Sequence, residues 1–146
     1  MKKWIKIVAI LAIFGIVAGV AGYFFVYNKP HANYEKMDAD FSLNASDLFN
    51  EFKTNKSVAE PKYNGKVVEI KGTLTKVEEA DSLVIAVFVF DQGMFGDEGI
   101  RCTMLPKYKD QLKNTQTGSQ AQLKGYLTGY NDTDVILEKC SITSKN

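Results

Sequence analysis

The stretch Val67-Val68-Glu69-Ile70-Lys71-Gly72-Thr73-Leu74-Thr75, residues 67–75, alternates apolar and polar side chains from Val68 onward. This period of two is typical of a β-strand with one face on a core and the other in solvent. Gly72 lies on the apolar face, where a glycine weakens a strand unless the strand must bend there. A long first strand that bends at a glycine is a feature of small, strongly coiled β-barrels.

Four further strands are predicted downstream. Residues 83–90 form a run of eight apolar residues, too short and too β-branched for a good helix. Two segments, residues 100–104 and 120–127, alternate apolar and polar residues, and the last strand, residues 135–142, has Ile136, Cys140 and Ile142 on one parity. Pro106 can open a short helix between the third and fourth strands. Residues 78–81 are expected to form a polar turn, and residues 91–99 a Gly-rich loop.

A helix is predicted before the first strand, from the favourable N-cap Asn44 to about Asn55. Its apolar face consists of Leu48, Phe49 and Phe52. The order is therefore a helix followed by β-β-β-α-β-β. This order predicts a mainly β fold, a five-stranded OB-fold barrel with an N-terminal helix and a short helix between strands 3 and 4. A five-stranded α+β sandwich is the alternative, but the position of the second helix favours the barrel.

An ordered set of residues in this region is also similar to a known family. The set comprises the helix Ala45–Phe52 and then Asn55, Tyr63, Gly65–Val68, Gly72, Cys102, Gly125, Gly129-Tyr130, Asp134-Val135 and Cys140. In these residues the chain resembles the tRNA-anticodon-like OB-fold family of small bacterial envelope proteins (tRNA_anti-like), over about residues 43–142. The resemblance implies an OB-fold, and it implies neither a catalytic residue nor a tRNA substrate.

The N-terminus carries a candidate membrane span. Residues 7–27 contain no charge, and Lys2, Lys3 and Lys6 precede them. A helix of this length is roughly 31 Å long, which matches a hydrocarbon core of about 30 Å. The lysines place Met1 in the cytoplasm by the positive-inside rule, so the rest of the chain is expected to be extracytoplasmic. The alternative is a signal peptide cleaved after Gly19-Val20-Ala21.

The predicted organisation has three parts: a transmembrane signal anchor over residues 1–27, a polar tether over residues 28–42, and an OB-fold domain over residues 43–144. The tether is expected to be neither apolar enough to pack nor basic enough to bind lipid headgroups. Residues 31–146 contain fourteen of the eighteen Lys and Arg residues and all seventeen Asp and Glu residues, so this part has a net charge of −3. Nucleic-acid-binding proteins usually show a basic surface, and this composition argues against that class.

A ligand-binding face is predicted on the barrel. OB-folds bind ligands on strands 2 and 3, beside the loops that here cover residues 78–82 and 129–134. The candidate contacts are Arg101, Tyr126, Tyr130 and Phe95, since aromatic side chains there can stack on sugars or bases. The alternative is that Phe95 and Tyr130 pack against the rim of the barrel. The acidic turns could offer oxygens to Ca²⁺, but they lack EF-hand spacing, so no metal site is expected.

The two cysteines, Cys102 and Cys140, fall on strands that are neighbours in an OB barrel, and both are expected to face the core. Outside the cytoplasm such a pair can form a disulfide. The alternative is two buried thiols that behave as small apolar side chains.

No motif for a catalytic site, cofactor or metal is present, and the chain has one histidine. We therefore expect a membrane-anchored binding module without enzymatic activity. Its expected ligand is a protein or an oligosaccharide of the cell envelope. The second hypothesis is a single-stranded nucleic-acid-binding OB-fold protein, and the third is a thiol-redox or metal-dependent enzyme.

Overall fold

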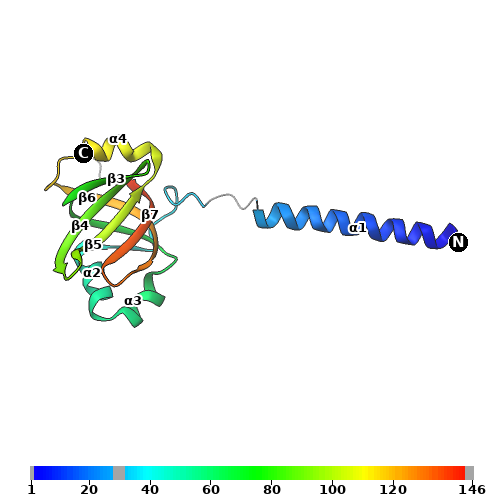
Figure 1. Ribbon diagram of the computed structural model, residues 1–146, viewed down its shortest axis with the longest axis horizontal. Helices are drawn as coiled ribbons and strands as arrows, with labels where there is room; N and C mark the ends of the chain where they lie inside the picture. Colours follow the sequence, from blue (N-terminus) through cyan, green and yellow to red (C-terminus); the bar gives the residue numbers. More distant parts are fainter. Residues whose placement is uncertain (1, 28–31, 144–146) are drawn as a thin grey trace. The chain divides into compact units, whose positions relative to one another are not determined.

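The computed structural model describes residues 2–27 and 32–143, which belong to two compact units, Met1–Ala32 and Asn33–Asn146. The first unit contains helix α1, Lys2–Tyr27 (Figure 1). By length and composition α1 is able to cross a membrane, and a signal sequence meets the same criteria. The predicted helical span is therefore confirmed as a helix. The predicted tether begins at residue 28, and its residues 28–31 lie outside the described residues.

The second unit is built on one sheet, whose seven described strands run in the order β1-β2-β6-β7-β5-β4-β3. The strands are β1 Phe41–Asn44, β2 Val67–Thr73, β3 Lys76–Ala80, β4 Leu83–Gly93, β5 Gly96–Met104, β6 Gln120–Tyr130 and β7 Asp134–Ile142. Strands β5 and β7 pair in parallel, so the third and fifth predicted strands are neighbours as expected. The remaining pairs are antiparallel except β1 with β2.

The predicted five-stranded barrel is wrong in strand number, since the described residues form one open sheet of seven strands. One reason is that the predicted first strand is divided into β2 and β3. The Leu74 N–H donates to Ser119 O at 2.9 Å, whereas the Thr75 N–H donates to Val87 O at 2.9 Å. The chain thus changes its pairing partner between residues 74 and 75, two residues after the predicted bend. The other reason is β1, which adds a parallel strand beside β2.

Gly72 has a packing role. A Cβ added there would lie 2.9 Å from Ala45 Cβ and 3.3 Å from Phe88 Cδ1. Distances this short are not tolerated between carbon atoms, so the glycine lets helix α2, Ala45–Thr54, approach strand β2 closely. The helix places its predicted apolar face, Leu48, Phe49 and Phe52, in the core.

Three other short helices complete the unit. Helix α3, Lys56–Tyr63, contains Pro61. The 3₁₀ helix Pro106–Tyr108 and helix α4, Lys109–Lys113, supply the predicted helix between strands β5 and β6. Figure 1 places α2 and α3 at one end of the sheet and α4 at the other.

The largest local errors concern two polar segments. The predicted turn at residues 78–81 lies mostly in β3, and the predicted loop at residues 91–99 is the paired end of the β4–β5 hairpin. Both segments can be strands because their charged side chains point outward and form ion pairs, while the backbone hydrogen bonds are made within the sheet.

Candidate functional site

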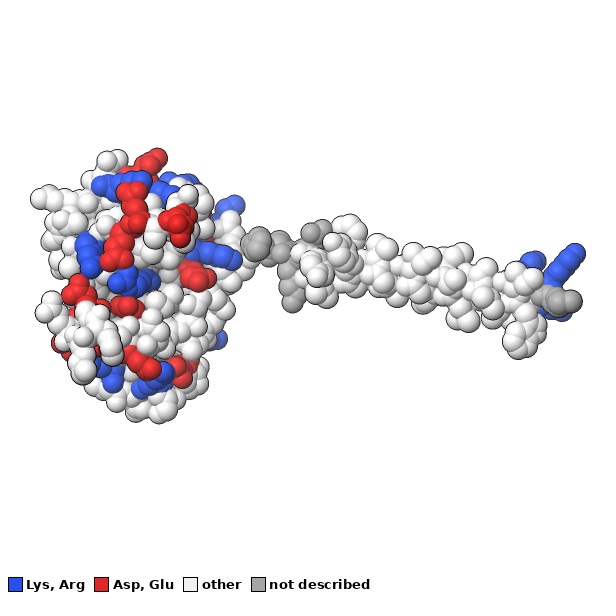
Figure 2. Space-filling view, viewed as in Figure 1, with Lys and Arg blue, Asp and Glu red and all other residues white. Residues whose placement is uncertain are grey.

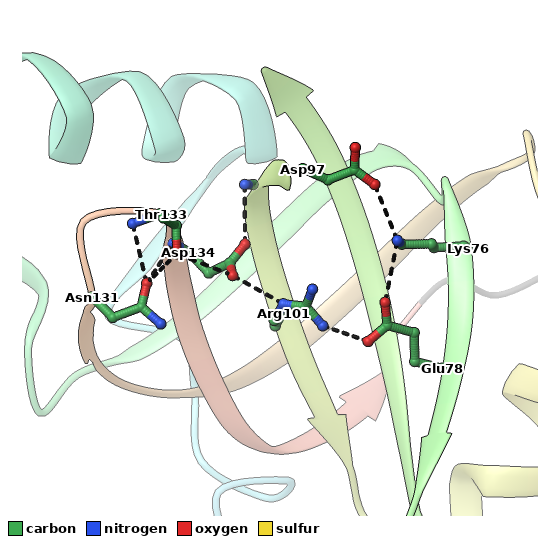
Figure 3. Close-up of polar contacts among 8 residues, drawn as sticks. Lys76, Glu78, Asp97, Arg101, Asn131, Thr133 and Asp134 are labelled. Atoms are coloured by element: carbon green, nitrogen blue, oxygen red, sulfur yellow. Dashed lines mark hydrogen bonds and ion pairs between the residues drawn. The ribbon is translucent and has the colours of Figure 1, made fainter. Parts of the chain in front are cut away.

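A chain of ion pairs crosses the outer surface of β3, β5 and β7 (Figure 3). Asp97 binds Lys76 Nζ at 3.0 Å, and Lys76 Nζ lies 3.2 Å from Glu78. Glu78 in turn contacts Arg101 at 2.5 Å, and Arg101 Nε donates to Asp134 Oδ2 at 3.0 Å. Five charged side chains from three strands are thus linked in one row. We call these five residues the charged ladder.

Asp134 is the buried end of the charged ladder, with 8% of its surface exposed. Its Oδ1 accepts a hydrogen bond from the Gly99 N–H at 3.2 Å, while Oδ2 accepts from Arg101. The turn before Asp134 is fixed by Asn131, whose Oδ1 accepts from the backbone N–H groups of Thr133 at 3.1 Å and Asp134 at 2.7 Å. This geometry holds Arg101 in place against the sheet.

The ion pairs of the charged ladder favour the charged forms of Lys76 and Asp97. Asp97 and then Glu78 raise the pKa of Lys76, and Lys76 and then Gln92 hold the pKa of Asp97 below its usual value. Two cations face three carboxylates, so the ladder itself has a net charge of −1. Figure 2 shows acidic and basic groups interleaved on this face of the domain, without one continuous basic patch.

A second ion-pair cluster lies beside the ladder. Lys53, in α2, binds Asp91 of β4 and lies 2.7 Å from Glu98 of β5. One cation again meets two carboxylates, which adds to the acidic character of the region. The pKa of Asp91 is lowered by Lys53 and then by the backbone N–H of Gln92, so this carboxylate also stays charged.

The four predicted binding residues have separate surroundings. Arg101 is half-buried within the ladder, and Phe95 is 92% exposed in the β4–β5 turn. Tyr126 stacks on Tyr34 with ring centroids 4.6 Å apart. The rings of Tyr130 and Phe52 pack together with centroids 5.5 Å apart, which agrees with the alternative prediction that Tyr130 packs against the rim. Phe95 does not pack in this way. That these four residues bind a ligand stays a prediction.

The segment Asn33–Asp40 is docked on the domain, although the sequence pattern predicted a free tether there. Besides the stacking of Tyr34 on Tyr126, Lys124 Nζ donates to the carbonyl oxygens of Glu35 at 2.9 Å and Met37 at 2.7 Å. The Glu35 carboxylate meets Lys107 at 2.5 Å. Lys107 first, and then a hydrogen bond from Tyr108, lowers the pKa of Glu35. We call residues 33–40 the docked segment; the stacking of Tyr34 and the pairing of its polar groups hold it on the domain.

Cys102 and Cys140 are both buried free thiols in this structure. They lie on the paired strands β5 and β7. Burial, and then contact with Cys102, raises the pKa of the Cys140 thiol well above its usual value, so little thiolate forms there. Such thiols pack as apolar groups.

A hollow of about 460 Å³ lies between α4 and β6, within the range of small-ligand pockets. None of its ten lining residues is charged. Its polar groups are the amides and hydroxyls of Gln111, Asn114, Thr115, Gln116, Ser119 and Gln120. Neutral hydrogen-bonding groups of this kind suit an uncharged polar ligand such as a sugar.

A family model matches residues 1–142, nearly the whole chain. The chain belongs to the tRNA_anti-like family. This assignment confirms the resemblance seen in the sequence and supports the OB-fold as the architecture of the domain. As a tRNA_anti-like protein the chain carries both the N-terminal apolar helix and the β domain within the matched region.

One solved structure shows a similar fold, and a second is a more distant match. A lipoprotein of Klebsiella pneumoniae, to which nucleic-acid binding is ascribed, is 14% identical, with a TM-score of 0.53 over 80% of this chain and 100% of the other. A Leishmania major protein, described as an aspartyl-tRNA synthetase, is 12% identical, with a TM-score of 0.48 over 72% of this chain and 21% of that one. No curated protein matches the chain.

Sequence reasoning missed most of the charged ladder. The sequence pattern places Glu78 in a turn and Asp97 in a Gly-rich loop, and it predicts no ion pair of either residue with Lys76, because ion pairs between distant strands depend on register. Met94 was also missed, although the sequence Gly93-Met94-Phe95-Gly96 places two apolar residues between two glycines. That pattern was the available signal.

Proposed function

We propose that the chain is a binding module without enzymatic activity, tethered by α1 to the cell membrane with its OB domain on the extracytoplasmic side. Its proposed ligand is a protein of the cell envelope. The orientation is supported by Lys2, Lys3 and Lys6, which precede the apolar run and favour a cytoplasmic N-terminus.

The observation that carries this proposal is the charged ladder. OB-folds bind oligonucleotides and oligosaccharides on the face that here contains β4 and β5, between the β3–β4 and β6–β7 turns. On this face Lys76 and Arg101 are already held by carboxylates, and carboxylates are in excess. A nucleic acid would have to break these pairs and add its own negative charge. A protein partner can instead exchange ion pairs with the ladder.

Two of the three candidate aromatic residues, Tyr126 and Tyr130, support the same choice. Binding of single-stranded nucleic acid combines a positively charged groove with aromatic rings on which bases stack. Tyr126 is covered by Tyr34, and Tyr130 packs on Phe52. Neither ring is therefore a free stacking platform in this structure.

An oligosaccharide is the second candidate ligand. The uncharged hollow beside α4, with its amide and hydroxyl lining, favours it specifically. Gln116→Ala and Gln120→Ala should weaken glycan binding if the hollow is the site, while leaving a protein bound at the charged ladder unaffected.

The test is binding of fluorescent single-stranded DNA and RNA to the full chain in nanodiscs of neutral lipid. We expect no saturation up to about 100 µM at low salt, the weak limit of non-specific binding. Binding in the micromolar range that weakens steeply as salt is raised would contradict the proposal. Envelope glycans are titrated in parallel, and the Gln→Ala variants serve as the control for the hollow.

A further inference from the structure

The turn of the β4–β5 hairpin carries two apolar side chains in solvent. Met94 is 94% exposed and Phe95 is 92% exposed. In the part of the β domain that the structure describes, the next most exposed large apolar side chain is Val58, at 56%. Exposed single apolar residues are ordinary, but an adjacent pair that contributes nothing to the fold is a candidate interaction element.

The turn is built so that these two positions can carry side chains. Two-residue hairpin turns usually place Asn or Gly at their central positions, because these need left-handed backbone angles. Here Gly93 pairs with Gly96, and the left-handed φ of +123° falls on Gly96. Met94 and Phe95 between them are therefore free to be large.

The base of the hairpin is fixed to helix α2. Phe90 stacks on Phe49 with ring centroids 5.6 Å apart. Lys53 connects the two strands by binding both Asp91 and Glu98. The tip is thus presented from a firm base, which lowers the entropy lost when it binds.

The charges of the hairpin select the partner. Residues 91–98 contain three carboxylates and neither Lys nor Arg. Lys53 and Lys76 reach in from α2 and β3 and compensate two of these charges, which leaves a net charge of −1 around the tip. An anionic lipid surface or a nucleic acid would meet like charge there, whereas a protein pocket with a basic rim would meet opposite charge.

We propose that Met94 and Phe95 form the docking element of the domain, which inserts into an apolar pocket with a Lys/Arg-rich rim on an envelope protein. This inference rests on the proposed function and names the contact residues and the chemistry of the partner. Two apolar side chains in a pocket, surrounded by polar contacts, match the usual anatomy of an interface hot spot.

The first experiment is photo-crosslinking in intact membranes with p-benzoylphenylalanine at position 95 of the full chain, and at position 58 as the exposed apolar control. We expect a discrete protein adduct from position 95 that position 58 does not give. Adducts to lipid, or no adduct from position 95, would overturn the inference.

The second experiment uses the crosslinked partner, purified and titrated against the full chain in nanodiscs. M94S/F95S should weaken binding about tenfold or more, and V58S should leave it unchanged; melting curves check that both variants fold. Gln92 is exposed next to the tip, so a charge at this position would face the proposed Lys/Arg-rich rim of the partner. Q92E should therefore bind the partner more tightly than wild type, and Q92K should bind it more weakly. Unchanged binding by M94S/F95S, or the reverse order of the Gln92 variants, would overturn the inference.

These outcomes are separable from failure of the proposed function. Saturable oligonucleotide binding would remove the proposed function itself. A protein adduct from the position of Thr103 in β5, with none from position 95, would keep the proposed function. It would remove only the inference that the hairpin tip contacts the partner protein.

Discussion

Replacing Asp134 by Asn should destabilise the β domain through a single pair of atoms. The Asn Oδ1 can still accept from Gly99 N–H, but its amide NH₂ replaces the oxygen that faces Arg101 Nε at 3.0 Å. One charge-assisted hydrogen bond is lost, and two donors then face each other in a site that is 8% exposed at Asp134. Such a loss costs about 2–3 kcal/mol in the free energy of unfolding. For a domain of roughly 110 residues this lowers Tm by about 10 °C.

The assay is thermal and urea unfolding of the full chain in detergent, followed by the far-UV circular dichroism of the β domain. The only tryptophan, Trp4, lies in α1, so its fluorescence does not report on this domain. D132N is the matched control, two residues away in the same turn. The Asp132 side chain is 77% exposed, so removing its ion pair with Lys56 should cost no more than about 0.5 kcal/mol.

A double-mutant cycle with R101M isolates the pair. Removing Arg101 also removes the donor that the new amide would face, so D134N/R101M should cost about 1 kcal/mol less than the sum of the single variants. Equal stabilities of D134N and D132N, or strictly additive effects in the cycle, would refute the role assigned to Asp134.

Three further outcomes are expected. K124M should lower the free energy of unfolding by about 1–2 kcal/mol and make residues 33–40 sensitive to protease, because two hydrogen bonds from Lys124 are lost. The control is K71M, which replaces an exposed lysine on the neighbouring strand β2. Equal behaviour of the two variants would speak against docking of residues 33–40. Native protein should resist alkylation at Cys102 and Cys140, and denaturation without reductant should release two reactive thiols per chain; none released would establish the disulfide. Tm should fall as the pH drops below the unfolded-state pKa values of 4.5 for Glu and 3.8 for Asp. The ion-paired carboxylates have lower pKa values in the folded state, so their stabilisation is lost as the pH falls through these lower folded-state values. A Tm that stays constant to pH 2 would argue against these pairs.

The elements that the sequence predicted correctly are those with a strong local period. Helix α2 has a clear apolar face, and strands β4 to β7 contain the apolar positions that pack in the core. Cys102 and Cys140 are buried as expected, although β7 also buries Val135 and Leu137, which have the other parity from Cys140. In each case one face is apolar because it is buried, so the pattern and the fold have the same cause.

The parts that could not be predicted depend on contacts between distant residues. Glu78 lies in β3, which pairs with β4, and its carboxylate meets Arg101, which is 23 residues away. The docked segment is held by Lys124, almost 90 residues after Glu35. Neither contact leaves a local period in the sequence. The covering of Tyr126 could not be predicted for a similar reason, since it is made by a segment that composition alone assigned to a free tether.

The location of the β domain tests the account most directly. In a bacterial host, alkaline phosphatase and a green fluorescent protein are each fused after residue 146 of the full chain. Phosphatase becomes active only after export, and the fluorescent protein folds only in the cytoplasm. The account predicts an active phosphatase fusion and a dark fluorescent fusion, both in the membrane fraction. A fluorescent fusion without phosphatase activity would place the domain in the cytoplasm and contradict an envelope binding module.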